Sequence, residues 1–292
     1  MARGAGVWNG RGMAGSRDFA QVDVFGQAPY LGNPVAVVLD GDGVEDEVMR
    51  RIANWTNLSE TTFVLSPNDP EADYRLRIFT PGLELEFAGH PTLGSAHAWL
   101  ENGGKPKRAG RIVQECAAGL VELRQGEGGL SFAAPPRRRV GELEAEHLAA
   151  IVDAFGIERE AVVSHQWVDN GPGWAVIRLG SAEEVLALEP DFSRFPTAMV
   201  GAVGEYPKGS EFAYELRTFA PASGVFEDPV CGSMNASVAQ WLTGAGEMPA
   251  AYKVSQGARL GRRGEVAIAV EEDGTVWVGG ATTTCFRGTA IA

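Results

Sequence analysis

Apolar and polar residues alternate along short segments of the chain, which is the pattern of half-buried β-strands. The alternation is clearest in Tyr74–Phe79. Further strands are predicted where apolar residues cluster, over residues 19–25, 33–39, 61–65, 120–123, 130–133, 174–179, 266–270 and 275–278. Apolar residues at helical spacing predict a helix over residues 45–55, and a second helix is expected over 142–155. This mixture is typical of an α+β fold.

The chain also repeats a segment of itself. Tyr74–Pro81 and Tyr214–Pro221 both read Y-x-L-R-x-F-x-P, and five identities at matching spacing are very unlikely to arise by chance. Downstream, Gly89–Ser95 aligns with Glu227–Ser233, and an apolar stretch follows each segment. Repeats of this kind indicate that one structural unit occurs more than once in the fold.

The alignment assigns equivalent positions to residues that could carry chemistry. It places His90 opposite Asp228 and Leu93 opposite Cys231. Each copy predicts a strand, then a turn bounded by proline, then a Gly-Ser step that begins an apolar helix, at Ser95 in the first copy and Ser233 in the second. We therefore expect the two helix starts to face each other across one site.

The repeat predicts two pseudo-symmetric α+β domains, each with a largely antiparallel sheet wrapped around its helix. Residues 1–17 are rich in glycine and show no periodicity, so a disordered leader is expected there. The N-terminal half then covers residues 18–134 and the C-terminal half residues 135–292, with a boundary near Pro135-Pro136. The last strand is allowed to return to the first half.

Composition and charge exclude several classes of protein. The chain has 292 residues, 45% of them hydrophobic and 22% charged, which is typical of a soluble globular protein of about two domains. A net charge of −13 argues against a nucleic-acid partner, because phosphate binding needs a basic face. No apolar run approaches the roughly 18 residues of a membrane span. Three widely separated cysteines form no disulfide framework, which indicates the reducing cytoplasm.

The facing helix starts suggest proton transfer on a carboxylate. Helix N-termini present unpaired N–H groups and the positive ends of dipoles, so they bind anions. Removal of a proton beside a carboxylate adds negative charge to it, and the same donors then stabilise the transition state. The general base is predicted to be Glu60, on a loop between a helix and a strand. His90 and Asp228 are expected on opposite sides of the cleft, where they could orient the base or the substrate or carry a second proton.

Other chemistries lack their patterns in this sequence. His90 and His97 lie seven helical residues apart, which is about 10.5 Å and too far for one metal ion. No Gly-x-Gly-x-x-Gly follows a strand, and Ser233 lies outside a Gly-x-Ser-x-Gly elbow. Neither a zinc site at these two histidines nor a nucleotide cofactor is therefore expected.

Four ordered motifs resemble the phenazine-biosynthesis isomerase family (PhzF-like proteins), which shares the diaminopimelate epimerase fold. These motifs are Gly32-Asn-Pro34, Asn57–Phe63, Phe87–Gly94 and Glu227–Ser233. The resemblance implies two similar domains, each with a barrel-like sheet around a central helix, and no metal or organic cofactor. It also implies catalytic roles for Glu60, His90 and Asp228, and substrate binding by Ser233, by Ser59 in the same motif as Glu60, and by the amides of Gly89 and Gly232.

One departure from the family pattern leaves alternatives open. Cys231 stands where these isomerases more often carry threonine, and the place is similar to that of a catalytic cysteine in two-thiol epimerases of the same fold. The first hypothesis is an isomerase or epimerase that uses Glu60 on a small carboxylate. The second is a racemase or epimerase in which the Cys231 thiol is a base. The third is a non-catalytic scaffold that binds a small carboxylate or a protein partner. Partly apolar matching surfaces also favour a homodimer.

Overall fold

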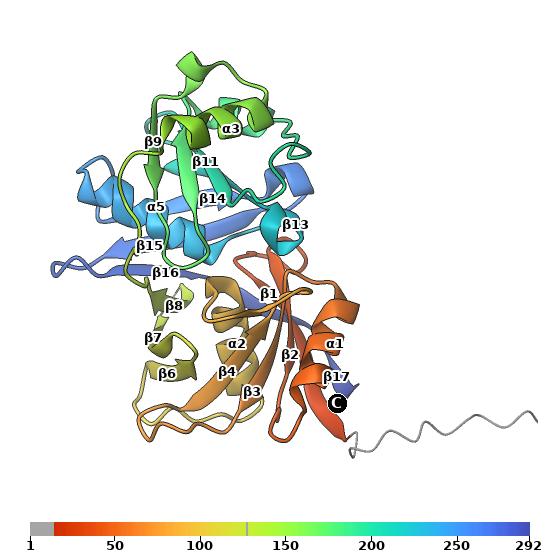
Figure 1. Ribbon diagram of the computed structural model, residues 1–292. Coiled ribbons are helices and arrows are strands. Elements are labelled where there is room, and N and C mark those ends of the chain that lie inside the picture. The colour runs from red at the N-terminus through yellow and green to blue at the C-terminus, as the bar shows by residue number, and fades with distance from the viewer. Residues whose placement is uncertain (1–14, 127) are drawn as a thin grey trace, which may run out of the picture.

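The computed structural model describes residues 15–126 and 128–292 (Figure 1). Most of the predicted leader, residues 1–14, falls outside the described residues. The prediction that the leader includes residues 16 and 17 is corrected, because Ser16 and Arg17 already belong to the first strand and pair with Ile291 and Ala290 near the end of the chain.

The first half contains two helices and eight strands among the described residues. In chain order they are β1 (Ser16–Val24), β2 (Asn33–Val38), α1 (Asp46–Thr56), β3 (Glu60–Leu65), β4 (Tyr74–Phe79), β5 (Glu84–Leu85), α2 (Gly89–Glu101), β6 (Arg111–Cys116), β7 (Gly119–Gly126) and β8 (Gly129–Ala133). The predicted helix over 45–55 is confirmed as α1, and the six strands predicted before residue 134 are confirmed, with ends that agree to within three residues.

The second half repeats this order with additions. Its elements are α3 (Ala145–Phe155), η1 (Arg159–Ala161), β9 (Ser164–Trp167), β10 (Ala175–Arg178), α4 (Ala182–Ala187), β11 (Val200–Glu205), β12 (Tyr214–Ala220), η2 (Pro221–Ser223), β13 (Val225–Asp228), α5 (Gly232–Gly244), β14 (Ala251–Gln256), η3 (Ala258–Leu260), β15 (Gly264–Val270), β16 (Val276–Gly280) and β17 (Thr282–Ile291). The helix expected over 142–155 is confirmed as α3.

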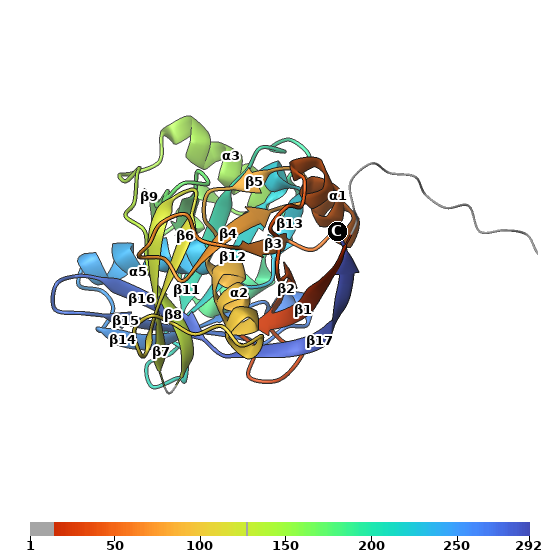
Figure 2. The ribbon, with the colours of Figure 1, turned by 90° about the horizontal axis from the view of Figure 1, so that it is seen from below.

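The two halves have the same strand topology. In the first, β2 and β3 are parallel, β3 and β4 antiparallel, β4 and β6 parallel across α2, and β6, β7 and β8 antiparallel. In the second, β10, β11, β12, β14, β15 and β16 pair in the same senses, with α5 as the crossover helix. Figure 2 shows α2 enclosed by the strands of its half. The predicted fold class, an α+β diaminopimelate epimerase-like fold with a sheet around a central helix, is confirmed.

Both central helices are apolar because they are buried on almost every side. Nine of the thirteen residues of α2 are buried, and nine of the thirteen of α5. Their small residues let the surrounding strands approach closely. Side chains of both helices, such as Leu93 and Val238, belong to one continuous core that extends through both halves.

Two strand pairings connect the halves along their sheets. β8 pairs with β16, so the ladders of the two halves are continuous. β17, the last strand, pairs antiparallel with β1 from Ser16 to Val24. Among the described residues, no helix is both long and apolar enough to cross a membrane.

The structure corrects the alignment of the two repeats beyond the shared strand. β5 pairs Leu85 with Ile78, and β13 pairs Asp228 with Thr218. Ile78 and Thr218 occupy the same place in the repeated motif, so the counterpart of Asp228 is Leu85 and not His90. The second copy has three more residues between its strand and its helix, and similarity of local sequence hid this insertion.

The helix starts shift accordingly. α2 begins at Gly89 and α5 at Gly232, so Gly89 and His90 correspond to Gly232 and Ser233. The prediction that Ser95 opens the first helix is wrong, because Ser95 lies in the middle of α2, where its Oγ is 2.8 Å from Thr62 Oγ1. Pro91 misled the prediction. A proline in the first helical turn loses no hydrogen bond, so the helix can begin before it.

Candidate active site

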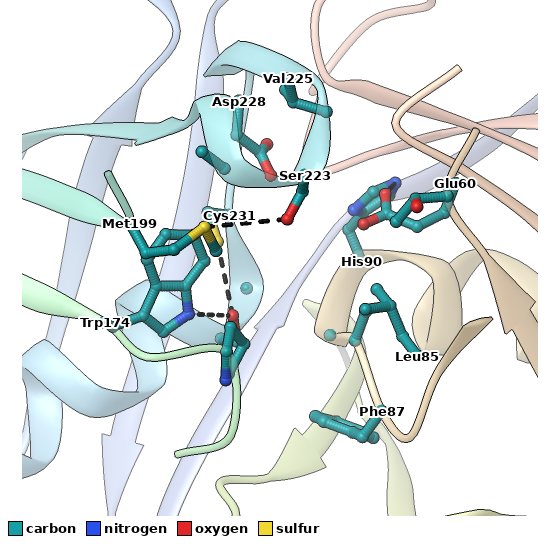
Figure 3. A pocket seen from close by; sticks show the side chains of 17 residues that line it. Glu60, Leu85, Phe87, His90, Trp174, Met199, Ser223, Val225, Asp228 and Cys231 are labelled. Atoms are coloured by element: carbon teal, nitrogen blue, oxygen red, sulfur yellow. Dashed lines mark hydrogen bonds and ion pairs between the residues drawn. The ribbon is translucent and has the colours of Figure 1, made fainter. Parts of the chain in front are cut away.

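A small cavity lies between the two halves, where α2 and α5 begin (Figure 3). Its volume is about 50 Å³. The predicted site residues that line it are Glu60, Gly89, His90, Asp228, Cys231, Gly232 and Ser233. Figure 3 shows Glu60 and His90 on one side of the cavity and Asp228, Cys231 and Trp174 on the other. The remaining lining is largely apolar and includes Phe87 and Met199.

The start of β3 places Glu60 against His90. Glu60 Oε2 lies 3.3 Å from His90 Nε2, and both atoms are buried without a hydrogen bond of good geometry. Burial, and secondarily the charge of Asp228, raises the pKa of Glu60 well above its usual value. Burial lowers the pKa of His90 to about 3, so its imidazole is neutral at pH 7. The contact therefore joins a neutral ring to a carboxyl group that holds its proton tightly.

Asp228 is held by backbone and amide donors on the other side. Its Oδ1 accepts hydrogen bonds from Val230 N at 3.0 Å and from Asn33 Nδ2 at 2.8 Å. Desolvation raises the pKa of Asp228 to about 7, although the Val230 donor opposes the shift. Near neutral pH this carboxyl group can both take up and release a proton.

The two helix N-termini touch at their first residues. A Cβ added to Gly232 would lie 3.0 Å from Gly89 Cα, and one added to Gly89 would lie 2.6 Å from the Phe132 ring. Neither position has room for a side chain. This contact brings the unpaired first-turn N–H groups of both helices into one place, which suits a single anionic group.

Ser233, in the first turn of α5, is oriented by a tryptophan. Trp174 Nε1 donates a hydrogen bond to Ser233 Oγ at 2.9 Å, so the serine hydroxyl proton remains available to another acceptor. Cys231 Sγ lies 3.5 Å from the same oxygen. Burial, together with the charge of Asp228, raises the pKa of the Cys231 thiol well above its usual value, so the thiol stays protonated.

Equivalent positions of the two halves carry different chemistry. The counterpart of Cys231 is Ala88, since these are the N-cap residues of α5 and α2. This corrects the prediction that Leu93 matches Cys231, because Leu93 is a core residue of α2. By the strand register, the residue that matches Glu60 is Met199.

Ser59 was predicted as a site residue but does not line the cavity, whereas Asn33 and Trp174 were not predicted and contact site residues. Ser59 precedes Glu60 but is not among the described residues that line the cavity, because successive side chains at a strand point to opposite faces. Asn33 and Trp174 were not predicted as site residues, although both contact one. Asn33 stood in the Gly-Asn-Pro motif, where its polar side chain before a buried strand was the available signal.

Glu60 was predicted on a loop, whereas it is the first residue of β3. Its backbone is thus held by the sheet, and its carboxyl group is positioned more firmly than a loop would allow. Over residues 15–126 and 128–292, no three His, Cys, Asp or Glu side chains gather closely enough to hold a metal ion.

Comparisons with known proteins agree with this picture. The family model for phenazine biosynthesis-like proteins, PhzC-PhzF, matches residues 22–288. Antisense-enhancing sequence 1 of Schizosaccharomyces pombe is 39% identical, over 92% of this chain and 97% of that protein. The trans-2,3-dihydro-3-hydroxyanthranilate isomerase of Pseudomonas aeruginosa is 33% identical, over 84% of this chain and 87% of that enzyme. A PhzF-family phenazine biosynthesis protein from Bacillus anthracis has the same fold, with a TM-score of 0.81 at 22% identity, over 95% of this chain and all of that one.

Proposed function

Because the chain belongs to the PhzC-PhzF family of phenazine biosynthesis-like proteins and is therefore an isomerase, we propose that it moves a proton on a small carboxylate-bearing metabolite. The reaction needs no cofactor in this proposal. The observation that carries it is the buried Glu60 carboxyl group, unpaired and facing His90, beside the two touching helix starts. These two features supply the base and the anion site that proton abstraction beside a carboxylate requires.

The substrate carboxylate is held at the helix starts in this proposal. The backbone N–H groups of Gly89 and Gly232 and the hydroxyl of Ser233 donate to it. When a proton leaves the neighbouring carbon, the electron pair of the C–H bond moves onto the carboxylate, and these donors stabilise the added charge. Each such donor is typically worth roughly 2.7–4 kcal/mol in mutagenesis.

Glu60 removes the proton when it is ionised, and its raised pKa suits this role. A base with a pKa near the working pH combines enough ionised form with a strong affinity for the proton. Asp228, on the other side of the cavity, can deliver a proton to the substrate. Return of the proton at a different carbon gives an isomer, and return from the opposite face gives an epimer.

The test is solvent-deuterium incorporation into a panel of carboxylate metabolites. We expect Glu60→Gln to lower incorporation by at least about 100-fold while substrate affinity changes little, since a positioned base contributes about 10²–10⁴-fold. Glu215→Gln is the matched control. Glu215 is also fully buried with a pKa raised by burial, but it lies outside the cavity, so incorporation should persist. Unchanged incorporation by Glu60→Gln would remove Glu60 from the mechanism.

The Cys231 thiol is the second candidate base, because it lines the cavity beside Asp228. Its raised pKa and the alanine at the matching position of the other half both favour Glu60 over a two-thiol mechanism. We expect Cys231→Ser to keep at least about a tenth of the exchange rate. Rapid inactivation by a thiol alkylator, blocked by substrate, would favour the thiol instead. Membership of an isomerase family favours catalysis over the non-catalytic scaffold.

We also propose that the protein forms a homodimer and acts in the cytoplasm. The reduced, unpaired cysteines fit that compartment, and exposed apolar side chains such as Phe286 and Ile291 on β17 fit a partner copy. Light scattering distinguishes a 31.0 kDa monomer from a particle of twice that mass.

A further inference from the structure

Asn33 contacts both His90 and Asp228, although it was not predicted as a site residue. It is the first residue of β2, and its side chain is completely buried. Its Nδ2 lies 2.8 Å from Asp228 Oδ1, 3.1 Å from Val230 O and 3.3 Å from His90 Nδ1. An amide of the first half thus holds the segment Asp228–Val230 of the second half, which leads from β13 to α5.

The orientation of this amide follows from its neighbours. The Val230 carbonyl oxygen can only accept a hydrogen bond, so the group that faces it must be the NH₂ of Asn33. The same NH₂ therefore donates to Asp228 Oδ1. Val230 N donates to that oxygen as well. Two donors converge on Oδ1, and a proton on this oxygen would have to compete with both of them.

We propose that Asn33 is a positioning residue that keeps Asp228 Oδ1 unprotonated, so that Oδ2 is the oxygen that exchanges a proton with the substrate. The inference rests on the proposed function, in which Asp228 is the second proton carrier. A carboxyl group that carries its proton on one defined oxygen delivers it in one direction. That property suits a site where the proton must return to a chosen carbon or face.

Several charged or titratable groups surround Asp228 besides this amide. Glu227 on β13 disfavours its ionised form, whereas the Cys231 side chain favours it through a hydrogen bond. Glu60 on β3 lines the same cavity, and the charge of Asp228 raises the pKa of Glu60. His90 on α2 is neutral, and Glu227 is paired with Arg217 at 2.8 Å. All of these groups remain when Asn33 alone is replaced. A change in the titration of Asp228 then reports the lost amide.

The experiment is a carboxyl-¹³C NMR titration of Asp228, assigned by the signal lost in Asp228→Asn. We expect the pKa of Asp228 to rise by about one unit or more in Asn33→Ala, because an N–H donor stabilises the carboxylate and each unit is a tenfold change in proton affinity. Asn33→Ser, which cannot reach Asp228 equally well, should show the same direction and serves if the alanine variant does not fold.

Gln114→Leu is the matched control. Gln114 is a completely buried amide that bonds Tyr74 and Thr92 and does not line the cavity. Its loss should lower stability without moving the pKa of Asp228. An Asp228 pKa that stays within about 0.3 units in both Asn33 variants, or that shifts equally in Gln114→Leu, overturns the proposal.

The exchange assay separates this inference from the proposed function. If the wild type exchanges no carboxylate substrate, the proposed function fails, yet the NMR titration still decides what Asn33 does to Asp228. If the wild type does exchange, Asn33→Ser should lower kcat with little change in KM. In the pH profile of kcat, the limb that reports the ionisation of Asp228 should also move away from its wild-type pH. The loss of a merely structural residue would not move it.

Discussion

The carboxyl groups of Glu60 and Asp228 differ from ordinary surface acids because both are buried, one on each side of a narrow cavity. Desolvation raises the pKa of Glu60 and of Asp228, and the charge of Asp228 further disfavours the ionisation of Glu60. The neighbouring His90 responds to the same burial in the opposite direction and loses its charge. At the scale of single residues, the site therefore contains two acids whose pKa values are raised by burial, and none of the described residues that line the cavity is a lysine or an arginine.

This burial predicts how activity depends on pH. Glu60 must be ionised to act as a base, and its pKa lies well above 4.5. The rate of deuterium incorporation, measured as kcat/KM, should therefore rise with pH along a limb placed well above pH 4.5. A limb at the usual pKa of glutamate would contradict the assignment, because it would indicate an exposed base.

The same shift predicts a stability change in Glu60→Gln. The folded-state pKa of Glu60 is raised, so its contribution to stability is complete below pH 4.5 and is lost as the pH rises through the folded-state value. Glutamine does not titrate. The variant should match the wild type near pH 4 and exceed it at pH 8 by at least about 1 kcal/mol, or ~2–4 °C in Tm. Equal melting temperatures at both pH values would show that the carboxyl group is solvated.

At the scale of elements, two helices meet end to end and their glycines make the contact possible. A residue with a Cβ at position 232 would press against the backbone of Gly89 and His90 at 3.0–3.2 Å. The backbone there cannot yield as a flexible side chain would. The close approach also defines the anion site, because it brings the free N–H groups of both helices together.

We expect Gly232→Ala to destabilise the protein by about 1–3 kcal/mol, the range for overpacking in a closely packed interior. Gly244→Ala is the control on the same helix, since no atom outside the adjoining turn of the helix backbone lies within 4 Å of the position where its Cβ would be. Alanine favours a helix over glycine, so that variant should be neutral or slightly more stable. Urea unfolding of both variants measures the difference, and equal free energies of unfolding would contradict the packing argument.

At the scale of the whole molecule, the halves share both a core and a sheet, and β17 closes the sheet of the first half from the far end of the sequence. It pairs with β1 over nine residues, from Ser16 to Val24. Thr282 and Thr284 on β17 also contact the His97 ring of α2. The first half is therefore incomplete without the last residues of the chain.

A chain that ends at Ala281 should consequently fail to fold cooperatively. Its β1 would lose one of its two neighbours and expose a row of unpaired N–H and C=O groups. Thermal unfolding followed by circular dichroism tests this expectation, with the full chain as reference. A truncated protein that melts cooperatively within a few degrees of the full chain would show that β17 is dispensable.

The local pattern of the sequence determined the elements that depend on neighbouring residues. Alternation predicted β4, helical spacing predicted α1, and the repeated Y-x-L-R-x-F-x-P motif predicted two similar halves. The matching ion pairs Arg77–Glu84 and Arg217–Glu227 show why that motif recurs, since each arginine holds the short strand before its helix. β5, β6, β9, β11, β13, β14 and β17 were not predicted. β5 has only two residues, and in the other strands the alternation is weak or the outer face is polar.

Only the tertiary structure decided how the site is assembled. The insertion before α5 changes which residues of the two halves are equivalent. Asp228 corresponds to Leu85, and Cys231 corresponds to Ala88. Alignment by local similarity could not detect this insertion. The role of Asn33 depends on contacts with residues almost two hundred positions away. The pKa values of Glu60, His90 and Asp228 depend on burial between the halves. The sequence determined which residue types were available for chemistry, and folding determined which of them share one closed space, because distance and desolvation exist only after the chain has packed.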